Sequence, residues 1–104
     1  MIDFLLKKQD RLEFICKDLK VKNLYAFGSV LSDNFKQESD LDLLVSFSSD
    51  LSIKTYTNNY FKMYYQLKHL YKREIDLITD KSLKNPFFAD QIDKTKKLLY
   101  ASRN

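Results

Sequence analysis

The sequence is poor in the residues that cross-link a chain, interrupt its helices or carry it through a membrane. Its 104 residues include one cysteine, one proline, one glycine and no tryptophan. Because the lone Cys16 excludes an internal disulfide, a reducing compartment is expected. The sequence also lacks an apolar run long enough to span a bilayer, and it lacks a signal-peptide pattern. We therefore expect a cytoplasmic protein without a membrane partner, folded as a single domain over residues 1–104.

The single glycine, Gly28, marks the stretch around which the rest of the chain is organised. It follows residues 23–27 (N-L-Y-A-F), an apolar run that predicts a strand, and it directly precedes Ser29. Glycine tolerates unusual backbone torsions and lets another group approach the backbone closely. Backbone N–H groups at a strand-to-helix turn form, together with a serine hydroxyl, a small anion site. We therefore predict that Gly28-Ser29 binds phosphate and that Ser29 caps a short helical turn.

Two aspartates follow ten residues after this pair, in the sequence Asp40-Leu41-Asp42. Residues 40–47 alternate between polar and apolar positions, which predicts a strand with both aspartates on one face. Their backbones would lie roughly 6.5–7 Å apart, so both carboxylates could reach one hard cation or bridge two. Mg²⁺ prefers such oxygen ligands together with substrate phosphates. The pair therefore predicts a metal site.

A third aspartate, Asp76, lies in residues 74–79 (E-I-D-L-I-T), which also predict a strand. If this strand neighbours the one that carries Asp40 and Asp42, the three acids would repel one another without a cation. A phosphate-binding turn facing such a cluster suits phosphoryl or nucleotidyl transfer. An Asp-x-Asp pair alone is more often a solvated strand end, and the alternative is a fold that has lost its chemistry.

The remaining pattern predicts an α/β fold, with helices at 2–19, at 53–71 and from Asn85-Pro86 onward, and a brief edge strand at 98–100. The order is helix, strand, strand, helix, strand, helix, which predicts a small mixed β-sheet backed by helices on one side. The buried stripe of the long helix is predicted to be Ile53, Tyr56, Tyr60, Met63, Tyr64, Leu67, Leu70 and Tyr71. The last helix is predicted to dock through Phe87, Phe88 and Ile92.

The net charge of +4 is unevenly distributed along the chain. Residues 1–50 carry seven basic and nine acidic side chains, whereas residues 51–104 carry eleven basic and five acidic ones. Lys72-Arg73 and the cluster at Lys94, Lys96 and Lys97 could face a polyanion or be solvated helix faces.

The spaced motif, from Gly28-Ser29 to Asp40-Leu41-Asp42 with Asp76 later, resembles the signature of the minimal nucleotidyltransferases. These are small members of the DNA polymerase β-like superfamily. The resemblance implies a nucleotidyltransferase fold like the polymerase β palm and covers nearly the whole chain. It implies that Asp40 and Asp42 hold two Mg²⁺ ions and that Gly28 and Ser29 bind the β- and γ-phosphates of ATP or another nucleoside triphosphate. Asp76 would bind the second metal and help to deprotonate the attacking hydroxyl.

The resemblance extends to MntA-like antitoxins, which are encoded beside a HEPN-domain ribonuclease toxin. Some of them inactivate the toxin by attaching AMP to a tyrosine, so a HEPN-type partner is implied here. One alternative is a binding module that neutralises its partner by complex formation with little catalysis. Another is an enzyme that modifies RNA, with the basic second half as the RNA-binding surface. A small-molecule acceptor is less attractive because such relatives usually carry an extra domain.

The sequence departs from the family after Gly28-Ser29. Many members continue with arginines, as in G-S-R-A-R-G, whereas residues 30–33 here are V-L-S-D. The difference removes charge that would support the triphosphate. Lys36, Lys72 and Arg73 are candidates to replace it.

Overall fold

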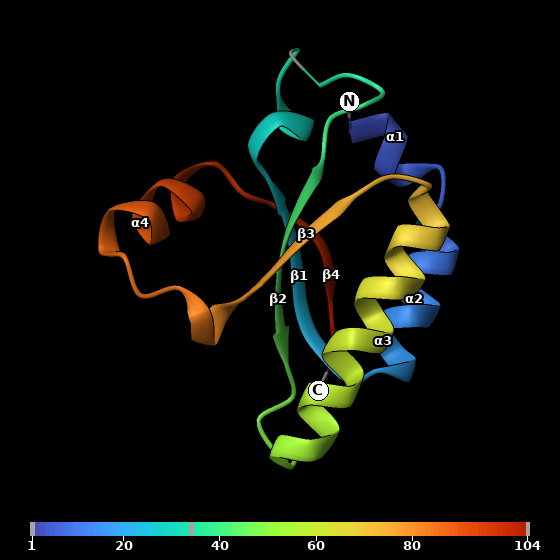
Figure 1. The fold of residues 1–104 in the computed structure, drawn as a ribbon, viewed down its shortest axis with the longest axis vertical. Helices are drawn as coiled ribbons and strands as arrows, with labels where there is room; N and C mark the ends of the chain where they lie inside the picture. The colour runs from blue at the N-terminus through green and yellow to red at the C-terminus, as the bar shows by residue number, and fades with distance from the viewer. Residues whose placement is uncertain (1, 34, 104) are drawn as a thin grey trace.

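The structure is a computed structural model that describes residues 2–33 and 35–103. Four strands form one mixed sheet in the order β3-β2-β1-β4, with antiparallel β1–β2 and β1–β4 pairs and a parallel β2–β3 pair (Figure 1). The α-helices are α1 (Ile2–Leu6), α2 (Gln9–Asp18), α3 (Ile53–Tyr71) and α4 (Pro86–Thr95). The strands are β1 (Val21–Phe27), β2 (Leu41–Phe47), β3 (Ile75–Thr79) and β4 (Lys97–Ala101), and short 3₁₀ turns cover η1 (Gly28–Leu31) and η2 (Asp80–Ser82). The predicted α/β architecture with a mixed sheet is therefore confirmed.

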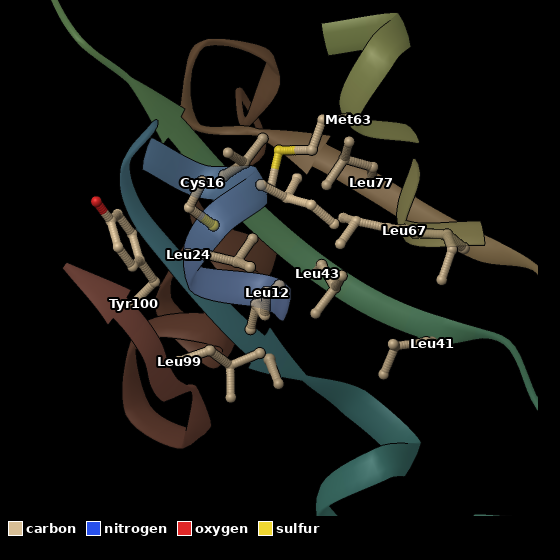
Figure 2. Close-up of a cluster of buried hydrophobic side chains, with 14 of the residues drawn as sticks. Leu12, Cys16, Leu24, Leu41, Leu43, Met63, Leu67, Leu77, Leu99 and Tyr100 are labelled. Carbon is tan, nitrogen blue, oxygen red and sulfur yellow. The ribbon is translucent and has the colours of Figure 1, made fainter. Parts of the chain in front are cut away.

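The main core lies between the sheet and helices α2 and α3, as Figure 2 shows. Leucines from both helices and from the strands meet there, with Met63 and Cys16 among them. Cys16 is fully buried, and burial together with the nearby Glu13 raises the pKa of its thiol to about 12. The thiol is therefore protonated at neutral pH and has little nucleophilic character.

The prediction that helices back the sheet on one side is wrong, because α4 lies on the opposite face from α2 and α3 (Figure 1). A second, smaller cluster joins Ile92 of α4 to Phe27 of β1 and Leu44 of β2. The run Leu43-Leu44-Val45 supplies apolar side chains to both faces of the central strand, which is typical of a strand covered on both sides. The aspartates of β2 and β3 share the α4 face with Leu44, because side chains alternate along a strand.

The first predicted helix, residues 2–19, is divided into α1 and α2. Lys8 occupies the N-cap of α2 with φ −117° and ψ 24°, outside the helical region. The bend allows Leu5 of α1 and Leu12 of α2 to be fully buried. Tertiary packing therefore overrides the continuous helical periodicity of the sequence.

The long helix α3 has the predicted bounds. Its N-cap is Ser52, whose hydroxyl accepts a hydrogen bond from the Thr55 backbone N–H at 3.1 Å. Ile53, which the stripe placed inside, is 87% exposed because it lies in the first turn, beyond the edge of the sheet core. The helix ends at Lys72, whose left-handed φ of 55° stops propagation. None of the helices in the described residues is long and apolar enough to span a membrane.

Helix α4 begins where predicted, but it docks differently. Of its three predicted docking residues, Ile92 is buried, whereas Phe87 is 83% exposed and Phe88 is 43% exposed. Adjacent positions on a helix diverge by about 100°, so one contact face cannot bury both rings and Ile92. The predicted edge strand is confirmed as β4, which pairs with β1 and extends over Lys97–Ala101.

Replacing Asn85 with alanine should lower the free energy of unfolding by about 1 kcal/mol. The Asn85 side-chain oxygen accepts hydrogen bonds from the backbone N–H groups of Phe87 at 2.9 Å and Phe88 at 3.4 Å. Alanine would leave these donors of the first turn to solvent. Urea unfolding measures the change, and Asn58→Ala on the exposed surface of α3 is the matched control. A loss no larger than that of the control would contradict this role of Asn85.

Candidate active site

The turn after β1 requires glycine for two independent reasons. Gly28 has φ +75°, a left-handed conformation that residues with a side chain rarely adopt. A Cβ at this position would also overlap the Oδ2 atom of Asp42 and lie 3.2 Å from its Cγ. Ser29 lies inside η1, and Phe27 occupies the N-cap, so the prediction that the Ser29 side chain caps this turn is wrong. The Ser29 backbone instead lies beside the Asp42 carboxylate and acts to lower its pKa.

Asp42 and Asp76 lie side by side on β2 and β3. The parallel register pairs these two residues directly, which meets the condition that the two strands be neighbours. Their carboxyl groups are close enough to influence each other's charge. Burial raises the pKa of Asp42 to about 6, and the charges of Asp76 and Asp40 add to the increase. Asp40 lies one residue before β2 with an exposed side chain, so it acts on Asp42 from the edge of the pair.

The residues on this face fit a divalent cation by the chemistry of their donors. Two carboxyl groups directly opposite each other on adjacent strands present oxygen atoms that can serve one hard cation. A cation would also relieve the repulsion that raises the Asp42 pKa. Over residues 2–33 and 35–103, no group of three or more His, Cys, Asp or Glu side chains is already arranged to hold an ion. The structure thus brings Gly28, Ser29, Asp42 and Asp76 together and leaves the Asp40 carboxylate turned to solvent.

A pocket of about 740 Å³ opens between this site and α4. Phe27 and Phe88 form an apolar wall, with ring centres 6.2 Å apart and an edge-to-face angle of 78°. Sequence reasoning missed Phe27, Phe88 and Lys94 as site residues. The available signal was the Phe87-Phe88 pair, since one face of a helix cannot bury two adjacent rings. The lining consists of Phe27, Gly28, Asp42, Asp76, Phe87, Phe88, Asp90, Gln91, Ile92, Lys94 and Thr95.

The basic residues near this pocket are not the ones that the sequence suggested as replacements for the missing arginines. Arg73 is engaged elsewhere, because its Nη1 atom donates to the carbonyl oxygens of Lys36 at 3.0 Å and Ser39 at 2.8 Å. Neither Lys36 nor Lys72 lines the pocket. Lys94 does line it, and its ammonium group lies 2.9 Å from Asp90 in an exposed ion pair. Among the residues that line the pocket, Lys94 is the one with a basic side chain.

A second cavity of about 740 Å³ lies at the opposite end of β1, far from the aspartates. Its basic lining residues are Lys17, Lys20, Lys22 and Arg103. They come from both halves of the sequence, so the basic second half does not by itself form a basic surface. Of the cluster that sequence reasoning singled out, Lys96 pairs with Asp93 at 2.8 Å and lies over the Tyr25 ring.

Comparison with known proteins identifies the same chemistry. The profile of the family "Polymerase beta, Nucleotidyltransferase" matches residues 10–104. A Methanocaldococcus jannaschii chain, provisionally named a protein adenylyltransferase, is 33% identical over 81 residues, which is 77% of this chain and 79% of that one. A second chain of that organism, named in the same way, is 29% identical over 75 residues, or 72% of each chain.

Solved structures share the fold at low sequence identity. One described as a minimal nucleotidyltransferase superposes with a TM-score of 0.75 at 21% identity, covering 91% of this chain and 92% of that one. Another, described as a tri-AMPylated HEPN toxin of Shewanella oneidensis in complex with an MNT antitoxin, gives a TM-score of 0.63 at 17% identity. It covers 94% of this chain and 73% of that one. The family match, the identity to the archaeal relatives and the juxtaposed Gly28, Asp42 and Asp76 agree, and the chain belongs to the polymerase β-type nucleotidyltransferases.

Proposed function

We propose that this nucleotidyltransferase transfers AMP, or another nucleoside monophosphate, from a nucleoside triphosphate to a tyrosine hydroxyl of a HEPN-type toxin and thereby acts as its antitoxin. The observation that carries the proposal is the direct pairing of Asp42 with Asp76 beside the backbone of Gly28. The names of the two archaeal relatives support transfer to a protein, and the complex of an MNT antitoxin with an AMPylated HEPN toxin supports the partner.

Each site residue has a role in this proposal. Gly28 and Ser29 bind the β- and γ-phosphates, because the start of a helical turn after a strand presents backbone N–H groups to an anion. Asp40 and Asp42 hold two Mg²⁺ ions, with Asp76 as a further ligand of the second. When bound, Mg²⁺ would neutralise charge on the triphosphate and stabilise the charge that develops at the reacting phosphoryl group.

Asp76 is suited to accept the proton of the attacking hydroxyl because its side chain is exposed and borders the pocket. The oxygen of that hydroxyl forms a bond to the α-phosphorus, and the bond from the α-phosphorus to the bridging oxygen breaks. Pyrophosphate leaves with the bond electrons. The exposed ring of Phe88, which packs against the buried Phe27, offers a surface for the nucleoside, since aromatic rings stack on bases.

An intact-mass assay tests the proposal. The product of the neighbouring gene would be incubated with the protein, ATP and Mg²⁺. We expect its mass to increase by one or more AMP units with the wild-type protein and with Asp80→Asn, and to stay unchanged with Asp76→Asn. Asp80 is the matched control because it is an exposed aspartate in the turn that follows β3.

Two other outcomes would overturn parts of the proposal. Unchanged mass while the two proteins still co-elute would favour a binding module that neutralises its partner without catalysis. If AMP were transferred to an RNA and not to the protein, the acceptor would be RNA. The basic cavity at Lys17, Lys20, Lys22 and Arg103 makes RNA the second candidate, and its binding should then weaken steeply with salt.

A further inference from the structure

Arg73 lies between α3 and β3, and its guanidinium group contacts two aromatic rings that also contact each other. Its guanidinium carbon is 4.4 Å from the ring centre of Phe4 and 4.3 Å from that of Phe35. The two rings meet edge to face at 5.6 Å between centres. The two adjoining rings make cation–π contacts that restrain the guanidinium group. Residues far apart in the sequence, on α1, on the loop before β2 and after α3, therefore meet at one arginine.

The hydrogen bonds of Arg73 enter the loop that connects η1 with β2. Nη1 donates to the carbonyl oxygens of Lys36 and Ser39, at 3.0 Å and 2.8 Å. These two residues also close a turn on each other. The Ser39 backbone N–H donates to the Lys36 carbonyl at 3.1 Å, and the Lys36 N–H donates to the Ser39 hydroxyl at 3.0 Å. Arg73 therefore holds the end of a compact turn.

The Ser39 carbonyl belongs to the peptide group that ends at the nitrogen of Asp40. Asp40 precedes β2 and has an exposed side chain, so the sheet ladder does not fix it directly. Its other neighbour in the chain, Leu41, is fixed, because the Leu41 N–H donates to the Glu74 carbonyl at 3.0 Å. The Arg73 contact therefore restrains Asp40 from the side that the sheet leaves free.

We propose that Arg73 is a positioning residue, which sets the place of Asp40 relative to Asp42 and Asp76 through the peptide group of Ser39. Arg73 is three residues before Asp76 in the chain, so the contact ties the first carboxylate to the strand of the third. The inference rests on the proposed role of Asp40 as a metal ligand. It also explains why Arg73 does not replace the arginines that relatives carry near the phosphates, since its guanidinium group already contacts two aromatic rings and its Nη1 donates to two carbonyl oxygens.

Hydrogen–deuterium exchange of the metal-free protein tests the contact itself. In Arg73→Met, the amides of Lys36 and Ser39 should exchange at least about tenfold faster, because the turn loses two charge-assisted hydrogen bonds. The amide of Leu24 in β1 should keep its rate, which shows that the fold is intact. Arg11→Met, at an exposed arginine of α2, is the matched control and should alter none of these amides. Unchanged exchange at Lys36 and Ser39 would overturn the inference.

Mg²⁺ titration, followed by the shift of the thermal unfolding midpoint, tests the positioning role. The Mg²⁺ dissociation constant should rise about tenfold or more in Arg73→Met, as is typical when a partner that orients a ligand is removed. Arg73→Lys keeps the charge and a donor but loses the planar stacking, and should show a smaller rise. Faster exchange with unchanged Mg²⁺ affinity would make Arg73 a purely structural contact and overturn the positioning role. A wild-type protein that does not bind Mg²⁺ would overturn the proposed function, while the exchange experiment would still decide the contact.

Discussion

The Asp42→Asn variant should unfold at a higher temperature than the wild-type protein in metal-free buffer at pH 7.5, and it should lose about a thousandfold in nucleotide transfer. Transfer falls because Mg²⁺ catalysis is worth several kcal/mol and each 1.4 kcal/mol is a factor of ten. Stability rises because the fold holds Asp42 beside Asp76 and partly buried, which raises its pKa from 3.8 to about 6. The ionised carboxylate therefore disfavours folding, and the neutral asparagine removes that cost.

The pH dependence has a definite sign. Because the pKa of Asp42 is higher in the folded than in the unfolded protein, its stabilising contribution is fully present below pH 3.8. That contribution is lost as the pH rises through about 6. The advantage of Asp42→Asn should accordingly be largest near pH 7.5 and nearly absent at pH 4.

Differential scanning fluorimetry with and without Mg²⁺ measures both effects. Mg²⁺ should raise the wild-type midpoint at pH 7.5, and it should leave the midpoint of Asp42→Asn nearly unchanged. Asp80→Asn, which retains the pair, should behave as the wild type does. If Asp42→Asn were less stable than the wild type in metal-free buffer at pH 7.5, the raised pKa would not describe the folded protein.

Gly28→Ala should lower the free energy of unfolding by at least about 1–2 kcal/mol, the cost of placing a residue with Cβ in the left-handed region. The new methyl group would also overlap the Asp42 carboxylate, so this side chain must move away from Asp76. Nucleotide transfer should therefore be lost even in the fraction that remains folded.

A double-mutant cycle separates the two causes of the Gly28 effect. In an Asp42→Ala background the overlap is absent, so Gly28→Ala should cost only the backbone strain. Urea unfolding of the four proteins gives the coupling between the two positions. Equal costs in both backgrounds would show that the carboxylate does not crowd the glycine.

The positions of the site residues along the chain could be predicted from the sequence because they depend on local patterns. A glycine after an apolar run and the alternation around Asp40 and Asp42 report backbone geometry within a few residues. Asp76 joins the site only because β3 lies beside β2 in the sheet. The sequence shows that this pairing is required for the site, but it does not show that the two strands pair.

Other parts depend on tertiary contacts that leave no local pattern. The division between α1 and α2 lets Leu5 and Leu12 share one core, although the periodicity continues through the break. The position of α4 on the second face follows from Ile92 and Leu44, which are adjacent only after folding. The sequence identified Arg73 only as a positive charge. Its hydrogen bonds to the loop before β2 could not be predicted, because its partners are backbone carbonyl oxygens, which every residue carries.

The burial of Cys16 makes this chain convenient for site-specific labelling. Its thiol is fully enclosed and has a pKa of about 12, so maleimide and disulfide reagents that require a thiolate have no accessible target while the protein is folded. A cysteine introduced at Phe87, which is 83% exposed at the rim of the pocket, would be a unique reactive group. A fluorophore attached there would report nucleotide or partner arrival without prior removal of the native cysteine.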